Sequence, residues 1–195
     1  MGWCPQAVRG GEKRTKLVAK FPLCSYHAPT MTAAAPISDH ADHAELKAAQ
    51  AVARGICRLF ARNDIWCLSE MPLRNARRAD LMGIDAKGHL VIVEIKVSRA
   101  DLLGDAQWPE YLDYCDRFYW GLAPHLDRSC MEQDAFLPER CGLIVADAYD
   151  AEILRPALTV PLAAARRKVE TERLARAALR RSLVLGDPLL NAWGD

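Results

Sequence analysis

The stretch from His89 to Val97 constrains the fold of this chain more than any other. It reads HLVIVEIKV, so apolar side chains occupy both alternating faces and are interrupted only by Glu94 and Lys96. A strand with two apolar faces has to be covered on both sides. We therefore expect an α/β protein in which this strand lies inside a sheet, with helices or loops packed on both faces.

Periodicity divides the rest of the chain into a regular core and two flanking segments. Apolar residues spaced by three and four predict a helix from Asp39 or Asp42 to Arg62. We expect further strands at about 65–70, 78–85, 117–121, 142–146 and 152–155, a helix at 99–114 that is kinked or broken near Pro109, and a last helix at 162–182. Residues 1–38 are expected to be a disordered extension, with Met31 as an alternative start. Residues 39–160 are expected to form the main domain, and 161–195 a basic helix and tail.

Composition excludes several classes of protein. Seven cysteines without a C-x-x-C spacing argue against a disulfide framework or a zinc ribbon, and favour a reducing cytoplasm. No run of 18 apolar residues occurs, so we expect no transmembrane span. The net charge is only +1, but residues 161–182 carry seven Lys or Arg against two Glu. Contact with nucleic acid would therefore depend on local basic patches.

A short connection at Asp85–His89 predicts the register of two strands. If Asp85 pairs with His89 around a three-residue loop, with Gly88 in the left-handed conformation, Asp80 falls opposite Glu94. Lys96 then lies on the same face as Glu94, because side chains alternate along a strand.

The connection at 72–77 extends this row of carboxylates. If it is centred near Asn75, Glu70 falls opposite Asp80, so that Glu70, Asp80 and Glu94 cross three strands. Clustered carboxylates are costly in a partly buried site unless a cation neutralises them. Two or three carboxylates with open positions suit Mg²⁺ or Mn²⁺.

At these residues the chain resembles the PD-(D/E)XK nuclease superfamily, whose signature stands here as Asp80 and Glu94-Ile95-Lys96. A more specific resemblance is to the MmcB-related DNA repair proteins. It is carried by the runs RRADL at 77–81, VEIKVS at 93–98, DAQWPEYLDYCDRFYW at 105–120 and GLIVAD at 142–147. The resemblance covers roughly 45–155. It implies a restriction-endonuclease-like α/β/α core, with a mixed central sheet flanked by helices, and a role in DNA repair.

The first functional hypothesis is a metal-dependent DNA nuclease. Asp80 and Glu94 would hold Mg²⁺ or Mn²⁺ with the Ile95 carbonyl and Glu70, and Lys96 would stabilise the attacking hydroxide. The first helix departs from the superfamily, because residues 51–54 contain no glutamate where many members carry a ligand. Glu45, about two turns earlier, is the alternative third ligand.

Several residues are candidates for contact with DNA. Arg74, Arg77 and Arg78 stand beside the acidic row, where a DNA backbone would pass. Gln107 and Tyr111 form a Gln-x-x-x-Tyr pair similar to a motif of RecB-type superfamily members. Tyr111 and the neighbouring Trp108 could stack on bases, although the density of aromatic residues from 108 to 120 favours a core role.

Two alternatives stay open at this point. Asp80, Glu94 and Lys96 are also consistent with a structural ion pair, or with a nuclease relic that binds DNA without cutting it. The second functional hypothesis is therefore a non-catalytic DNA-binding or scaffold protein, with DNA and other repair proteins as partners. The basic face of the last helix (Arg166, Arg173, Arg176 and Arg180) fits phosphate contact and an ordinary solvated surface equally well.

Overall fold

A computed structural model describes the backbone of residues 39–193 and the side chains of residues 43–190. The described residues belong to one compact unit. Our expectations for residues 1–38, including the alternative start at Met31, lie outside the described residues. None of the described helices is long and apolar enough to cross a membrane.

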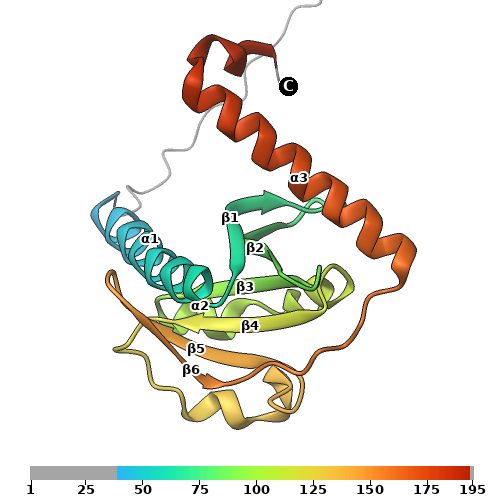
Figure 1. Ribbon diagram of the computed structural model, residues 1–195. Helices are drawn as coiled ribbons and strands as arrows, with labels where there is room; N and C mark the ends of the chain where they lie inside the picture. Colours follow the sequence, from blue (N-terminus) through green and yellow to red (C-terminus); the bar gives the residue numbers. More distant parts are fainter. Residues whose placement is uncertain (1–38, 194–195) are drawn as a thin grey trace, which may run out of the picture. The chain divides into compact units, whose positions relative to one another are not determined.

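A six-stranded mixed sheet forms the centre of the fold (Figure 1). The strands follow one another across the sheet in chain order, and β1–β2–β3 are antiparallel, β3–β4–β5 parallel and β5–β6 antiparallel. The predicted α/β fold with a mixed sheet is confirmed, and every expected strand is present. Their bounds are β1 (Ile65–Pro72), β2 (Arg78–Asp85), β3 (Leu90–Lys96), β4 (Arg117–Leu122), β5 (Gly142–Ala146) and β6 (Ala151–Arg155).

Within the described residues, three α-helices and four 3₁₀ turns accompany the sheet. The α-helices are α1 (Asp39–Arg62), α2 (Arg99–Gly104) and α3 (Ala164–Gly186), and the 3₁₀ turns are η1 (Trp108–Asp113), η2 (Ser129–Glu132), η3 (Asp134–Phe136) and η4 (Pro188–Trp193). The expected helix over 99–114 is wrong as a single element, because α2 ends at Gly104 and η1 begins a new turn. Pro109, which has no N–H to donate, lies at the start of η1, where an N–H would have no partner.

The sheet separates two hydrophobic cores, as the doubly apolar β3 predicts. On one face, Val91 and Val93 of β3 pack with Ile56 and Phe60 of α1. On the other, Leu90 and Ile92 pack with residues of α2, η1 and the connecting segments. Glu94 and Lys96 follow Leu90 and Ile92 at a spacing of two residues, so they share the face that α2 and η1 cover.

Asp116 fixes α3 to the sheet on this second face. Its buried carboxylate accepts hydrogen bonds from the backbone N–H groups of Leu90 (2.8 Å) and Leu162 (2.8 Å), and pairs with the guanidinium of Arg167. Burial disfavours the ionised form, but these hydrogen bonds outweigh it and hold the pKa of Asp116 below its usual range. One carboxylate thus joins the start of β3, the start of β4 and the first turn of α3.

Candidate functional site

The β2–β3 hairpin has the predicted register. Leu81 pairs with Val93 and Ile84 with Leu90, and Gly88 takes a φ of +79° in the connecting turn. The backbone ladder stops at Leu81, one position before Asp80 and Glu94 face each other.

Asp80 occupies the point where the two strands separate. Its Oδ2 atom accepts a hydrogen bond of 2.7 Å from the backbone N–H of Ile95, so a side chain replaces the backbone acceptor that the ladder would have supplied. Burial raises the pKa of Asp80 to about 6, against the lowering effect of this hydrogen bond and of Lys96. The carboxylate therefore has both a structural contact and a raised proton affinity.

Glu94 is the most unusual group of the site. It is 6% exposed, and within the described part of the chain its Oε2 atom has no hydrogen-bond partner. Burial, and then the charge of Asp80, raise its pKa to about 8. A buried carboxylate oxygen without a donor is costly unless a proton or a cation accompanies it.

Lys96 lies among three carboxylates. Its Nζ atom is 3.4 Å from Glu94 Oε1, 3.2 Å from Asp101 Oδ1 and 3.1 Å from Asp105 Oδ2. Burial opposes the ammonium form, yet Glu94 and Asp101 outweigh it and raise the pKa of Lys96 above its ordinary value. The lysine is therefore a buried ammonium group whose positive charge three neighbouring carboxylates stabilise.

Asp101 and Asp105 are site residues that the sequence reasoning missed. They lie one helical turn apart, on α2 and directly after it, so both can face the end of β3. The side chain of Ser98 caps α2 by accepting from the backbone N–H of Asp101, which sets where the helix begins. The four-residue spacing of two aspartates just after Glu94-Ile95-Lys96 was the signal available in the sequence.

The expected third ligand, Glu70, lies close enough to contribute to the raised pKa of Asp80, but its carboxylate pairs with an arginine. The β1–β2 register agrees with the prediction on both sides of Glu70, since Ser69 pairs with Leu81 and Met71 with Ala79. Glu70 itself has a φ of +52°, and its exposed carboxylate pairs with Arg78 at 2.5 Å. The alternative ligand Glu45 is exposed on α1.

Without Glu70 and Glu45, few candidate ligands remain for a metal ion. Among the described residues, no group of three or more His, Cys, Asp or Glu side chains is arranged to hold a metal ion. Asp80, Glu94 and the carbonyl of Ile95, which directly follows Glu94, leave two carboxylates and one backbone oxygen. Mg²⁺ commonly binds through one or two carboxylates and completes its shell with water and phosphate oxygens. The residues present therefore fit a hard, partly hydrated divalent cation, and the unpartnered Glu94 Oε2 supplies an open ligand atom.

Four of the five candidate DNA-binding residues come together beside the acidic cluster. Arg77, Arg78, Gln107 and Tyr111 line a surface hollow of about 480 Å³, together with Asn75, Ala76 and Glu110. Arg77 Nε donates to Glu110 Oε2 at 2.8 Å, its terminal nitrogen donates to Gln107, and its guanidinium lies 5.7 Å from the centre of the Tyr111 ring. Arg74 is exposed on the loop that leads to this hollow. Asn75 and Glu110 were not predicted.

The aromatic segment forms core, as its density indicated. Trp108 is buried against Phe118 and Trp120, with ring centroids 5.4 and 5.0 Å apart. The Tyr111 ring is buried as well, and its hydroxyl donates to the Arg78 carbonyl at 3.1 Å. Tyr111 therefore supports both arginines of the hollow, and a direct contact with DNA stays a prediction.

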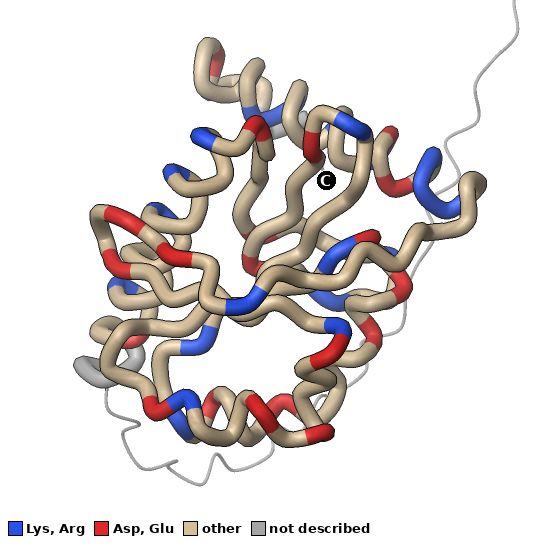
Figure 2. The backbone as a smooth tube through the Cα atoms, turned by 60° about the horizontal axis from the view of Figure 1, so that its bottom comes forward, with Lys and Arg blue, Asp and Glu red and all other residues tan. Residues whose placement is uncertain are grey.

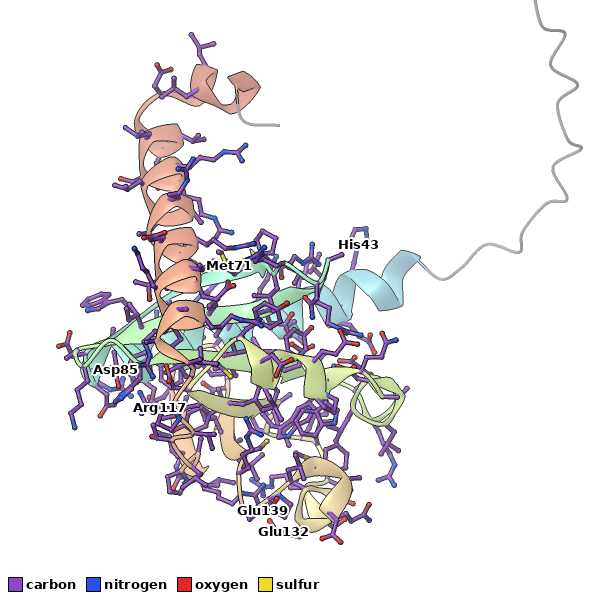
Figure 3. All side chains as sticks on the ribbon, turned by 90° about the vertical axis from the view of Figure 1, so that its right-hand side faces the viewer. His43, Met71, Asp85, Arg117, Glu132 and Glu139 are labelled. Atoms are coloured by element: carbon purple, nitrogen blue, oxygen red, sulfur yellow. The ribbon has the colours of Figure 1, made fainter. Side chains whose placement is uncertain are left out.

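Charges of both signs are spread over the backbone, as the blue and red segments of Figure 2 show. Another group of charged residues lies at the turn of the β2–β3 hairpin. Asp85 and Arg117 lie near each other there (Figure 3) and form an ion pair of 2.7 Å. Asp85 also pairs with His89 at 3.1 Å. This cluster stabilises the turn that sets the register of the site.

Comparisons with known proteins agree with the resemblance found in the sequence. Residues 37–188 match the family model described as DNA repair protein MmcB-like. A solved structure of the SPO1766 protein of unknown function from Silicibacter pomeroyi is 40% identical, with a TM-score of 0.63, and the match covers 72% of this chain and 92% of that one. No curated protein gave a significant match. Because the family model spans most of the sequence, the chain belongs to the MmcB-like family of DNA repair proteins.

Proposed function

We propose that this DNA repair protein is a metal-dependent nuclease that hydrolyses DNA phosphodiester bonds at the Asp80–Glu94–Lys96 cluster. The observation that carries the proposal is the buried Glu94 Oε2, which has no donor in the described part of the chain and lies beside a second carboxylate with a raised pKa. Two carboxylates that resist joint ionisation form a site with affinity for a cation.

Asp80, Glu94 and the Ile95 carbonyl are the groups that would hold Mg²⁺ or Mn²⁺. The bound cation would neutralise the scissile phosphate and lower the pKa of an attacking water. Glu70 is not needed for this set, because water and a phosphate oxygen can complete a magnesium shell. Asp80 would also keep the strand end open through its hydrogen bond to the Ile95 N–H.

Lys96 supplies the fixed positive charge of the site. Its Nζ atom lies 3.4 Å from Glu94, so it can donate to a phosphate or water oxygen next to that carboxylate. Asp101 and Asp105 hold the ammonium group in place from α2. Such a preorganised charge stabilises negative charge that develops on the phosphate.

The arginines on the loop between β1 and β2 would guide the DNA backbone to this cluster. Arg77 is held by Glu110, Gln107 and Tyr111, whereas Arg74 and Arg78 are exposed. Phosphate contacts of this kind position a duplex without reading its sequence.

One observation favours the second candidate function, a DNA-binding or scaffold protein that does not cut. Lys96 is already neutralised by three carboxylates, and in the described residues no third acidic side chain joins Asp80 and Glu94 as a ligand. A relic of a nuclease site could keep this arrangement as a buried ion network.

Isothermal titration with Mg²⁺ and Mn²⁺, combined with a cleavage panel of single-stranded, duplex, flap and junction DNA, separates the two functions. The nuclease proposal expects metal binding and cleavage in the wild type, both lost in Asp80→Asn and Glu94→Gln. Glu139→Gln, which changes an exposed glutamate (Figure 3), is the matched control and should behave as the wild type. DNA binding without metal binding or cleavage would refute the proposal and support the second function.

A further inference from the structure

The C-terminal half of α3 carries an apolar surface that the domain does not cover. Within α3, all of which is described, only Glu170 and Leu174 are buried. Beyond them, Leu179, Leu183 and Leu185 are 66%, 62% and 86% exposed. Helices in proteins owe most of their stability to packing of an apolar face, so a helical segment with exposed leucines indicates a missing partner.

Two hollows lie along this segment and share Arg180 and Val184. The first, of about 320 Å³, is lined by Arg176, Leu179, Arg180, Leu183, Val184 and Leu190. The second, of about 540 Å³, is lined by Pro72, Ala177, Arg180, Arg181, Val184 and Leu185. In Figure 1 the C-terminal end of α3 extends beyond the sheet, while the helix contacts β1 and β2 along the rest of its length. The surface is therefore a ridge with an apolar hollow on each side.

Hydrogen bonds to β1 fix the direction of the second half of the helix. Arg181 donates to the backbone carbonyls of Ser69 (2.6 Å) and Glu70 (3.1 Å) at the end of β1. Arg176 and Arg180 stay exposed beside the leucines. The apolar hollow of Leu179 and Leu183 is thus bordered by two arginines that point to solvent.

The charge of this surface selects among possible occupants. Residues 173–186 contain four arginines and no acidic residue. A second copy of the chain would place these arginines against each other, and the segment 1–38 carries five Lys or Arg against one Glu, so both are repelled. An acidic occupant is attracted.

The distribution of the leucines argues against nucleic acid and lipid. Arg176 and Arg180 lie on the same arc of the helix as Leu179 and Leu183, because residues four apart share a face. DNA phosphates would leave these leucines in water. A membrane-bound helix instead separates an apolar face from a charged face.

We propose that residues 175–186 of α3, with their two hollows, are a docking surface for an amphipathic acidic helix of a partner protein. The leucines of the partner would fill the hollows, in the manner of a helix in a groove, and its Glu or Asp side chains would pair with Arg176 and Arg180. This surface is separate from the proposed metal cluster, so the inference does not depend on cleavage.

The test uses the full chain and two synthetic helical peptides of about four turns. Both carry leucines at three- and four-residue spacing; one has glutamates beside the leucines and the other has lysines. Fluorescence anisotropy should show binding of the glutamate peptide, with about tenfold weaker binding of the lysine peptide, which corresponds to about 1.4 kcal/mol. Leu183→Glu should weaken binding of the glutamate peptide by a similar factor. Leu46→Glu, which changes an exposed leucine of α1, should leave this binding unchanged.

Reversing the two arginine charges should strengthen binding of the lysine peptide and weaken binding of the glutamate peptide. The double variant Arg176→Glu/Arg180→Glu should prefer the lysine peptide, because the border of the hollow then changes sign. Absent binding, equal binding of both peptides, or equal loss in Leu46→Glu would overturn the proposal. Self-association in sedimentation, binding to anionic phosphatidylglycerol vesicles, or duplex DNA binding that Leu183→Glu abolishes would also overturn it, since each identifies another occupant. DNA cleavage should stay unchanged in Leu183→Glu and Leu46→Glu.

Discussion

Replacing Lys96 by Met removes the only positive charge in contact with the buried carboxylates of the site among the described residues. The Nζ atom makes three contacts of 3.1 to 3.4 Å, and the residue is 3% exposed. Breaking a buried ion pair on one side costs about 3–5 kcal/mol, because the partner charge stays buried. Asp101 is well exposed and can rehydrate, so most of the cost falls on Glu94.

The cost of Lys96→Met should depend on pH with a definite sign. At pH 5, Asp80 (pKa about 6) and Glu94 (pKa about 8) keep their protons in the folded wild type. Both pKa values are raised above the unfolded values, so the folded state loses stability as pH rises toward them. Without Lys96 the pKa values of both carboxylates rise further. The variant therefore continues to lose stability at pH values above those at which the wild type has stopped losing it. The added loss is at most about 1.4 kcal/mol per pH unit for each carboxylate.

Urea unfolding at pH 5 and pH 9, with and without Mg²⁺, measures this difference. We expect a loss of about 1–3 kcal/mol at pH 5, from the contacts to the two aspartates of the α2 region, and of about 3–5 kcal/mol at pH 9. Mg²⁺ should restore part of the stability at pH 9 in the variant, since binding to the folded state alone stabilises it. An equal loss at both pH values would show that Lys96 is kept for packing and not for charge.

Three further changes test the surrounding contacts. Asp105→Asn should cost about 1–2 kcal/mol in urea unfolding, because it removes one charge-assisted contact of Lys96; a loss as large as that of Lys96→Met would contradict this. Asp116→Asn should cost about 3–5 kcal/mol at pH 7. Since the pKa of Asp116 is lowered, the wild type should begin to lose this advantage as pH falls below the unfolded value of about 3.9; a gap as large at pH 2 as at pH 7 would refute the assignment. Glu170→Leu should raise the melting temperature and increase the free energy of unfolding by about 1 kcal/mol, because neither oxygen of this fully buried glutamate has a hydrogen bond among the described residues. A lower melting temperature would show that the ion pair with Arg173 at 3.6 Å stabilises the fold.

The register of the site was predictable because a local feature determines it. The turn at Asp85–His89 closes around Gly88, and the side-chain alternation of β3 then places Glu94 and Lys96 on one face. Both effects act over a few residues, so the sequence contains all the information they need.

The missed parts of the site depend on longer-range geometry. Asp101 and Asp105 reach Lys96 only because α2 folds back over the end of β3, and no periodicity encodes that path. Glu70 was placed by strict alternation, but its φ of +52° turns its carboxylate to Arg78. A left-handed backbone at a glutamate is rare, and a strict alternation of side chains does not predict it.

The way in which Asp80 ends the β2–β3 ladder decides which substitution can test its role. Its carboxylate accepts from the Ile95 N–H at 2.7 Å, so Asp80→Ala would leave a backbone donor without a partner, at a cost of about 1–3 kcal/mol. Asp80→Asn keeps an acceptor oxygen at the same place and removes the charge. Because burial raises the pKa of Asp80, a neutral side chain is tolerated there, and we expect Asp80→Asn to melt at or above the wild-type temperature while Asp80→Ala melts below it. If thermal melts show both variants equally destabilised, the charge of Asp80 is needed for folding, and loss of metal binding or cleavage in Asp80→Asn could no longer be assigned to a missing ligand.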